Sequence, residues 1–150
     1  MYLTSRDEVR GRAAVEQLKK LGLNPQFHQL DIDDEASIIR LRNYLKENYG
    51  GLDVLVNNAA IFLELHSSDI HLGVLATKTL RTNFFNTLTV CNILFPLLRP
   101  HARVVNMSSA AGHLTCIEGD TLAANQLKEK LISTDLTNEE LCALIQRFAE

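Results

Sequence analysis

The chain has 150 residues, 46% of them hydrophobic, which is enough for one compact domain with its own core. Its formal charge of −3 is spread without a basic block, which argues against a nucleic acid or an anionic membrane surface as partner. There is no apolar run near the ~20 residues of a membrane span and no signal-peptide layout, so we expect a soluble, cytoplasmic protein.

The cysteines and histidines do not form a metal-binding pattern. Cys91, Cys116 and Cys142 are odd in number, far apart and without a CxxC pair, which argues against a disulfide framework and a zinc site. His66 and His71 share a polar stretch without cysteine or acid ligands at metal spacing. We therefore expect no metal.

The first part of the chain alternates between strand and helix patterns. The predicted elements are a strand over 1–5, a helix from the N-cap Asp7 to about Leu21, a strand over 25–30 and a helix over 34–49. Each helix has apolar residues spaced for one buried face: Ala14, Leu18 and Leu21 in the first, and Ile38, Leu41, Leu45 and Tyr49 in the second. Both helices end at glycine.

The stretch 52–60 combines an apolar strand with a polar end. Its apolar run follows Gly50 and Gly51 and is typical of a parallel strand covered on both faces. Ligands of open α/β sheets bind beyond the carboxyl ends of the strands, where Asn57 and Asn58 would project their amides. The stretch therefore predicts a small-molecule site.

The second part of the chain continues the alternation. A helical stretch from about Leu72 to Leu98, closed by Pro96 and Pro100, precedes a strand over 104–107 that ends in small and polar residues. This order predicts a doubly wound parallel α/β sheet in residues 1–113. Residues 114–150 are expected to form a helical insertion, in which Thr137 and Glu140 make a capping box.

Four segments resemble the short-chain dehydrogenase/reductase family. The segment 57–60 is similar to the family's NNAG motif, with Ala60 in place of the usual glycine. The segments 27–34, 82–85 and 103–109, together with 50–59 around that motif, resemble the NADPH-dependent carbonyl reductase branch. The resemblance implies a Rossmann-like fold, NADPH as cofactor, and hydride transfer to a small-molecule carbonyl substrate: an aldehyde, a ketone or a quinone. By analogy it also implies a monomer.

The resemblance implies three contacts to the adenosine part of NADPH. Arg6 would hold the 2′-phosphate with its guanidinium, although an isolated arginine beside acids is more often a surface residue. Asp31 would accept a hydrogen bond from the adenine amino group, and Ile32 would pack on the ring. An acidic run at this place could equally cap a helix.

The resemblance also assigns residues near the reacting groups. Asn58, Ala59 and Ala60 would line the ribose and nicotinamide, although an Asn-Asn pair after a strand is also an ordinary turn. Ser109 would steady the carbonyl oxygen of the substrate, and Asn83 would help hold a water chain. A single asparagine inside a helix is otherwise a surface residue or a kink.

Several features of the family are not found in these 150 residues. The Gly-rich phosphate turn is missing before Arg6, and the Tyr-x-x-x-Lys pattern is missing after Ser109. Met1 is expected to lie in the family's second strand, so the fold would lack its first strand, which belongs between 1–5 and 52–57, and its last strands. Two strand edges would then remain unpaired at the centre of the sheet.

Two hypotheses about function follow. The chain is either part of an NADPH-dependent carbonyl reductase or a shortened, non-catalytic isoform or pseudoenzyme that acts as a binding fragment. Activity on glutathione conjugates is not implied, because the acid Glu64 in the loop 62–65 would repel a glutathione carboxylate.

Overall fold

The computed structural model describes residues 1–62, 72–117, 119 and 121–149. The strands are β1 (Tyr2–Ser5), β2 (Gln26–Gln29), β3 (Leu52–Asn57) and β4 (Leu98–Asn106). The α-helices are α1 (Glu8–Lys20), α2 (Glu35–Tyr49), α3 (Leu72–Leu80), α4 (Thr87–Leu94), α5 (Leu122–Ile132) and α6 (Asn138–Ala149). A π-helix (Arg81–Asn86) joins α3 to α4, and 3-10 turns span Phe95–Leu97, Ala110–Gly112 and Leu114–Cys116. The predicted α/β class is confirmed.

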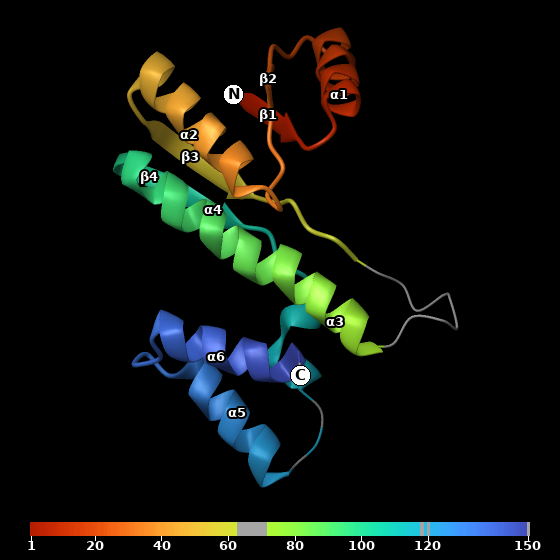
Figure 1. Cartoon of the computed structure of the whole chain (residues 1–150), viewed down its shortest axis with the longest axis vertical. Coiled ribbons are helices and arrows are strands. Elements are labelled where there is room, and N and C mark those ends of the chain that lie inside the picture. Colours follow the sequence, from red (N-terminus) through yellow and green to blue (C-terminus); the bar gives the residue numbers. More distant parts are fainter. Residues whose placement is uncertain (63–71, 118, 120, 150) are drawn as a thin grey trace.

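The strands form two separate parallel pairs. β1 pairs with β2, with Tyr2 opposite Gln26, and β3 pairs with β4, with Asn57 opposite Asn106. Among the described strands, no ladder joins β1 to β3. Figure 1 shows α1 beside the first pair, and α2 and α4 beside the second. The sheet is therefore interrupted where the sequence predicted a missing strand.

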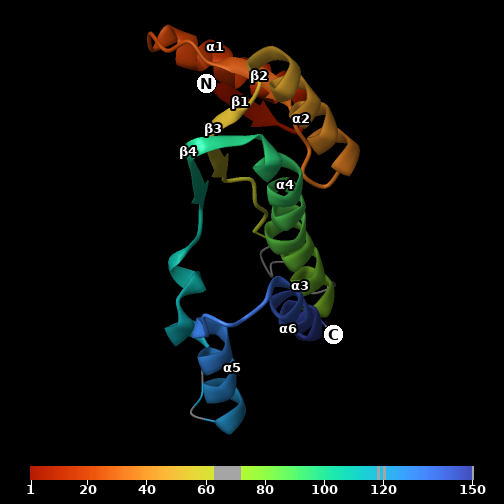
Figure 2. The ribbon, with the colours of Figure 1, turned by 90° about the vertical axis from the view of Figure 1, so that its left-hand side faces the viewer.

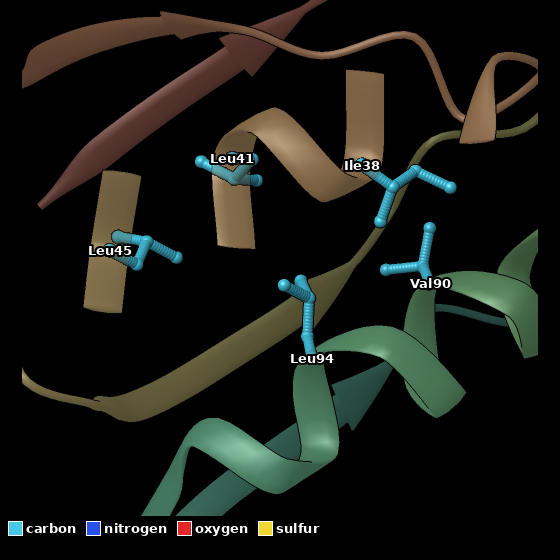
Figure 3. Packing of buried hydrophobic residues seen from close by; sticks show 5 residues of the cluster. All are labelled: Ile38, Leu41, Leu45, Val90 and Leu94. Atoms are coloured by element: carbon cyan, nitrogen blue, oxygen red, sulfur yellow. The ribbon is translucent and has the colours of Figure 1, made fainter. Parts of the chain in front are cut away.

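The main hydrophobic core lies between α2 and α4. Ile38, Leu41 and Leu45 of α2 meet Val90 and Leu94 of α4, and all five are buried (Figure 3). The predicted buried face of α2 is confirmed at its first three positions. Burial of one such side chain stabilises the fold by about 1.5–3 kcal/mol, so this helix pair is the principal source of stability.

Tyr49, the fourth predicted core residue of α2, is not in the core. It is 45% exposed, and its hydroxyl lies 2.6 Å from the Tyr2 hydroxyl. Tyr44 bonds the same Tyr2 oxygen, also at 2.6 Å. Desolvation and these two hydrogen bonds raise the pKa of Tyr2. The three tyrosines connect β1 to α2 and so hold the two strand pairs together.

Helix α1 buries the predicted face in part, since Ala14 and Leu18 are half-buried on it. Asp7 is its N-cap, as predicted, and accepts from the Arg10 N–H at 2.9 Å. The buried residues are Gly11 and Val15, whereas Leu21 is 75% exposed. Phe27 from β2 packs closely on this face, and its ring lies where a side chain on Gly11 would be.

The helical stretch predicted over 72–98 is shorter and divided. Pro96 has no N–H to continue the helix, so α4 ends at Leu94 and a 3-10 turn follows. The chain then becomes extended, and β4 begins at Leu98 rather than at Val104. Between the pairs Leu52–Leu98 and Val54–Arg103, β4 has more residues than β3, and the register of the two strands shifts there. His101, which lies in this part of β4, has a positive φ of 67°.

Strand β3 is covered on one face only, which corrects the prediction that both faces are buried. Leu52 and Leu55 pack against the α2–α4 core. Val54 and Val56 point to the other face and are 55% and 54% exposed. Both helices that flank β3 in the chain lie on the same side of it, which Figure 2 shows in side view.

The C-terminal region forms the predicted helices. Thr137 and Glu140 make the reciprocal capping box, with N···O distances of 3.1 and 3.2 Å. Helix α6 contacts α3, and α5 extends beyond it (Figures 1 and 2). The proposed division of the chain at residue 113 remains a prediction.

Candidate functional site

The carboxyl ends of β1, β2 and β3 surround a cavity of about 240 Å³. Its lining contains five of the six residues predicted to bind a cofactor: Arg6, Asp31, Ile32, Ala59 and Ala60. These residues follow three strand ends, and the most distant of them, Arg6 and Ala60, are 54 positions apart in the chain. A parallel arrangement brings them together because all three strands end at the same edge.

Arg6 offers a positive charge at this cavity. Its side chain is exposed, and its guanidinium has no hydrogen bond or ion pair within the described part of the chain. Its backbone carbonyl accepts from Gln29 Nε2 at 3.2 Å, which ties the end of β1 to β2. The neighbouring arginine Arg10 is instead paired with Asp7 at 3.0 Å. Arg6 is therefore free to bind an anion.

Asp31 does not cap α2. That cap is Asp34, whose carboxylate accepts from the Ala36 N–H at 3.0 Å. Asp31 Oδ1 accepts from the Asp33 N–H at 3.0 Å, and the Asp31 N–H bonds the buried Ser37 hydroxyl, also at 3.0 Å. Local hydrogen bonds thus fix the carboxylate at the cavity wall.

The π-helix contributes Thr82 to the cavity wall, and its other polar side chains bond residues beside the cavity. Thr82, which is buried, donates to Asp33 Oδ1 at 3.1 Å, and Asn86 donates to the same oxygen. Asn83 bonds both backbone groups of Ile61, at 2.8 and 2.9 Å. A π-helix widens the turn and is frequent at functional sites.

The Asp33–Thr82–Asn86 network was not expected from the sequence. The partners of Asp33 are 49 and 53 positions away, and no local pattern links them. The only signal was the group of polar residues in the otherwise apolar stretch 80–95.

Asn57 and Asn58 have different environments. Asn57 Nδ2 donates to Asn106 Oδ1 at 2.8 Å and contacts Cys91 Sγ at 3.3 Å, so its side chain links β3 to β4 and α4. Burial raises the pKa of the Cys91 thiol, which keeps it protonated. Asn58 is exposed and lines, with Ala59, a larger cleft of about 950 Å³ between β1 and β3.

Ser109 lies just beyond the carboxyl end of β4. Its Oγ accepts from the Ala111 N–H at 3.3 Å and caps the short turn Ala110–Gly112. The side chain is exposed, and its hydroxyl hydrogen remains able to donate. Neither Ser109 nor Asn83 lines the 240 Å³ cavity.

Two further observations concern metals and membranes. In the described residues, no group of three or more potential metal ligands comes together. None of the helices within residues 1–62, 72–117 and 121–149 is long and apolar enough to span a membrane. The pair His66 and His71 and the acid Glu64 lie outside the described residues.

The family assignment comes from comparison with known sequences. The sequence model of the short chain dehydrogenases matches residues 1–139. The chain belongs to the short-chain dehydrogenase family. A Bos taurus protein named carbonyl reductase [NADPH] 1 is 48% identical to this chain over 151 residues. The alignment covers 100% of this chain and 52% of that protein.

Solved structures agree with this assignment. Menthone neomenthol reductase from Mentha piperita matches with a TM-score of 0.79 and 26% identity, over 99% of this chain and 63% of that one. RhlG of Pseudomonas aeruginosa, in a complex with NADP, matches with a TM-score of 0.62 and 28% identity, over 87% and 52%. This short-chain dehydrogenase spans about half the length of the curated relatives it matches.

Proposed function

We propose that this chain carries the adenosine-binding part of an NADPH-dependent carbonyl reductase that converts aldehydes, ketones or quinones to alcohols. One observation supports this most directly: five of the predicted cofactor residues line one cavity, and one of them is Arg6, whose guanidinium has no partner among the residues that the structure describes. The 48% identity to an NADPH carbonyl reductase supports the same cofactor. We further propose a monomeric, cytoplasmic protein.

The chemistry of the donor set fits the adenosine end of NADPH. Arg6 would hold the 2′-phosphate through charge-assisted hydrogen bonds, which selects NADPH over NADH. Asp31 would accept from the adenine amino group, and Ile32 would cover the ring. Ala59 and Ala60 carry only a methyl group each, so a bound ribose could approach the backbone closely.

The remaining residues would act on the substrate side. When bound, NADPH supplies the hydride for the carbonyl carbon. Asn58 would help to orient the nicotinamide half, and Ser109 would donate a hydrogen bond that steadies the carbonyl oxygen. Asn83 holds Ile61 and so positions the strand end; its contact with a water chain remains a prediction.

A second candidate function is binding without turnover. All three tyrosines, Tyr2, Tyr44 and Tyr49, precede Ser109 in the sequence, and the hydroxyls of Tyr44 and Tyr49 both bond the Tyr2 hydroxyl where β1 meets α2. No tyrosine of this chain is therefore placed to donate a proton beside Ser109. On this hypothesis the 150-residue chain binds NADPH and leaves carbonyl compounds unchanged.

The decisive experiment is cofactor titration of the purified chain. NADPH and NADH would be titrated into wild-type protein, into Arg6→Gln and into Arg10→Gln as the matched control. We expect Arg6→Gln to weaken NADPH binding about tenfold, or ~1.4 kcal/mol, with little change for NADH. Equal effects of Arg6→Gln on both cofactors would overturn the assignment of Arg6, and NADPH oxidation with an added quinone would overturn the second candidate.

A further inference from the structure

The Asp33 carboxylate and the Arg6 guanidinium border the same cavity. Both residues line the 240 Å³ cavity, and both are exposed. Opposite charges at one site attract, and Arg10, four positions after Arg6, is paired with the nearby acid Asp7 at 3.0 Å. Across residues 1–62, 72–117 and 121–149, however, Asp33 bonds two uncharged side chains and not the guanidinium. The uncharged partners of Asp33 therefore explain why Arg6 is unpaired.

These two partners of Asp33 are donors on the π-helix. The Thr82 hydroxyl donates to Asp33 Oδ1 at 3.1 Å, and the Asn86 amide donates to the same oxygen. The donors are four positions apart in the chain, so they lie on the same side of the helix. Thr82 is buried and Asn86 is half-buried, so packing holds both in place. One oxygen of the carboxylate is thus fixed by two donors from a single helix.

The bonds to the π-helix outweigh an ion pair with Arg6. A buried hydroxyl that loses its acceptor destabilises the fold, and hydrogen bonds to a charged acceptor are stronger than those between neutral groups. An ion pair between two exposed side chains contributes little, because water screens the charges and both side chains lose conformational freedom. With Thr82 and Asn86 present, Asp33 therefore stays at the π-helix, and the guanidinium stays available.

We propose that Thr82 and Asn86 determine the cofactor specificity of this chain by holding the Asp33 carboxylate away from Arg6. The guanidinium then remains free for the 2′-phosphate, the group that distinguishes NADPH from NADH. This inference rests on the proposed contact between Arg6 and that phosphate. Asn86 does not line the cavity, so its effect passes through Asp33, and both donors are positioning residues.

Loss of the two donors would act against NADPH in two ways. A released Asp33 carboxylate can turn toward Arg6 and form the ion pair that the π-helix now prevents. Its negative charge would also repel the 2′-phosphate across the cavity. NADH has no 2′-phosphate, so neither effect applies to it. The signature of the proposed role is therefore a change in the preference between the two cofactors and not a general loss of binding.

The first test needs no ligand. Hydrogen exchange at the Arg6 Nε–H would be followed by NMR in the complete 150-residue chain. It should slow at least twofold in the double variant Thr82→Val/Asn86→Ala, because the guanidinium gains the Asp33 carboxylate as acceptor. Addition of Asp33→Asn to the double variant removes the charge and should return exchange to the wild-type rate. Unchanged exchange in the double variant would overturn the proposal.

The second test measures cofactor preference. NADPH and NADH would be titrated into the same variants, and the ratio of the two dissociation constants compared. We expect Thr82→Val/Asn86→Ala to lower the preference for NADPH about fivefold, the size of one exposed ion pair, with little change for NADH. Addition of Asp33→Asn should restore the preference. Equal weakening of both cofactors, with no recovery from Asp33→Asn, would mean that the donors only support the fold, and the proposal would be wrong.

Two further variants guard against effects on folding. Thr89→Val is the matched control, because the Thr89 hydroxyl bonds a carbonyl one turn before it at 3.1 Å and does not line the cavity. It should leave the cofactor preference at the wild-type value. If the double variant does not fold, Asn86→Ala alone should lower the preference at least twofold, and Asp33→Asn should reverse this loss. An unchanged preference in Asn86→Ala would then refute the inference.

Failure of this inference and failure of the proposed function give different results. If wild-type protein does not prefer NADPH, or if Arg6→Gln leaves the preference unchanged, the contact of Arg6 with the phosphate is wrong and both proposals fall. If the preference depends on Arg6 but survives the loss of Thr82 and Asn86, only the inference about these two donors is overturned.

Discussion

Both polar atoms of the Asn83 amide bond the backbone of Ile61: Oδ1 accepts from its N–H at 2.8 Å, and Nδ2 donates to its carbonyl at 2.9 Å. The pair connects the π-helix to the chain that leaves β3. Ile61 and the two residues before it, Ala59 and Ala60, line the 240 Å³ cavity. Asn83 thus fixes the shape of that cavity without lining it.

Replacement of Asn83 by alanine should lower both stability and cofactor affinity. Loss of the two hydrogen bonds leaves the Ile61 backbone groups without their partner, at a cost of about 1–3 kcal/mol in the free energy of unfolding. Urea denaturation would measure this cost, with Asn92→Ala, at an exposed position of α4, as the control. If Asn83→Ala and Asn92→Ala unfold at the same urea concentration, the Ile61 contact contributes nothing.

Replacement of Ile38 by alanine should be among the most destabilising single changes. Ile38 is fully buried between α2 and α4, and its truncation leaves a cavity in the core. We expect a loss of about 2–5 kcal/mol in chemical denaturation. Ile132→Ala, on the exposed side of α5, should stay within about 0.5 kcal/mol of wild type. Similar losses for both variants would contradict the assignment of the core.

Two glycine-to-alanine changes in helices should have opposite effects. A Cβ on Gly11 would lie 2.1 Å from Phe27 Cε2, whereas a Cβ on Gly73 in α3 would meet no atom of the described residues within 4 Å. Alanine favours a helix over glycine by about 1 kcal/mol, so Gly73→Ala should stabilise the protein. Gly11→Ala should destabilise it by about 1 kcal/mol, because the ring must move. Thermal melts would show the sign, and Gly11→Ala combined with Phe27→Leu should recover stability.

The N-terminus of α6 should weaken in acid. Hydrogen bonding from the Thr137 N–H, followed by the charge of Lys130, lowers the pKa of Glu140 below its ordinary value of 4.5. A lowered folded-state pKa means that the stabilisation is complete above pH 4.5 and is lost as the pH falls through the folded value. Amide exchange of Glu140 and Leu141 across this window would report it. Glu140→Gln should flatten the dependence, and an unchanged profile in that variant would refute the capping contribution.

The elements that the sequence predicted well are those set by local pattern. Asp7, Asp34 and the Thr137–Glu140 pair cap helices through bonds to residues two or three positions away, so their effect is readable in a short window. The α2 core face was also predictable from its spacing. Leu21 and Tyr49 were not, because their burial depends on which element packs against the last turn of each helix.

The candidate site shows the same distinction. Arg6, Asp31, Ala59 and Ala60 were predictable because they follow strands, and parallel strands end at one edge. The bonds of Thr82 and Asn86 to Asp33 were not, since they join segments about 50 positions apart.

Sequence alone therefore determined the α/β class, the order of the elements, the placement at strand ends of the residues proposed to bind a cofactor, and the expectation of unpaired strand edges. Tertiary structure decided that β3 is bare on one face, that the Asn57 side chain links β3 to β4, and that β1 and β3 line one cleft. The physical reason is the distance along the chain over which each kind of interaction acts. Hydrophobic periodicity and caps act over a few residues, whereas burial and edge pairing depend on which distant segments come into contact.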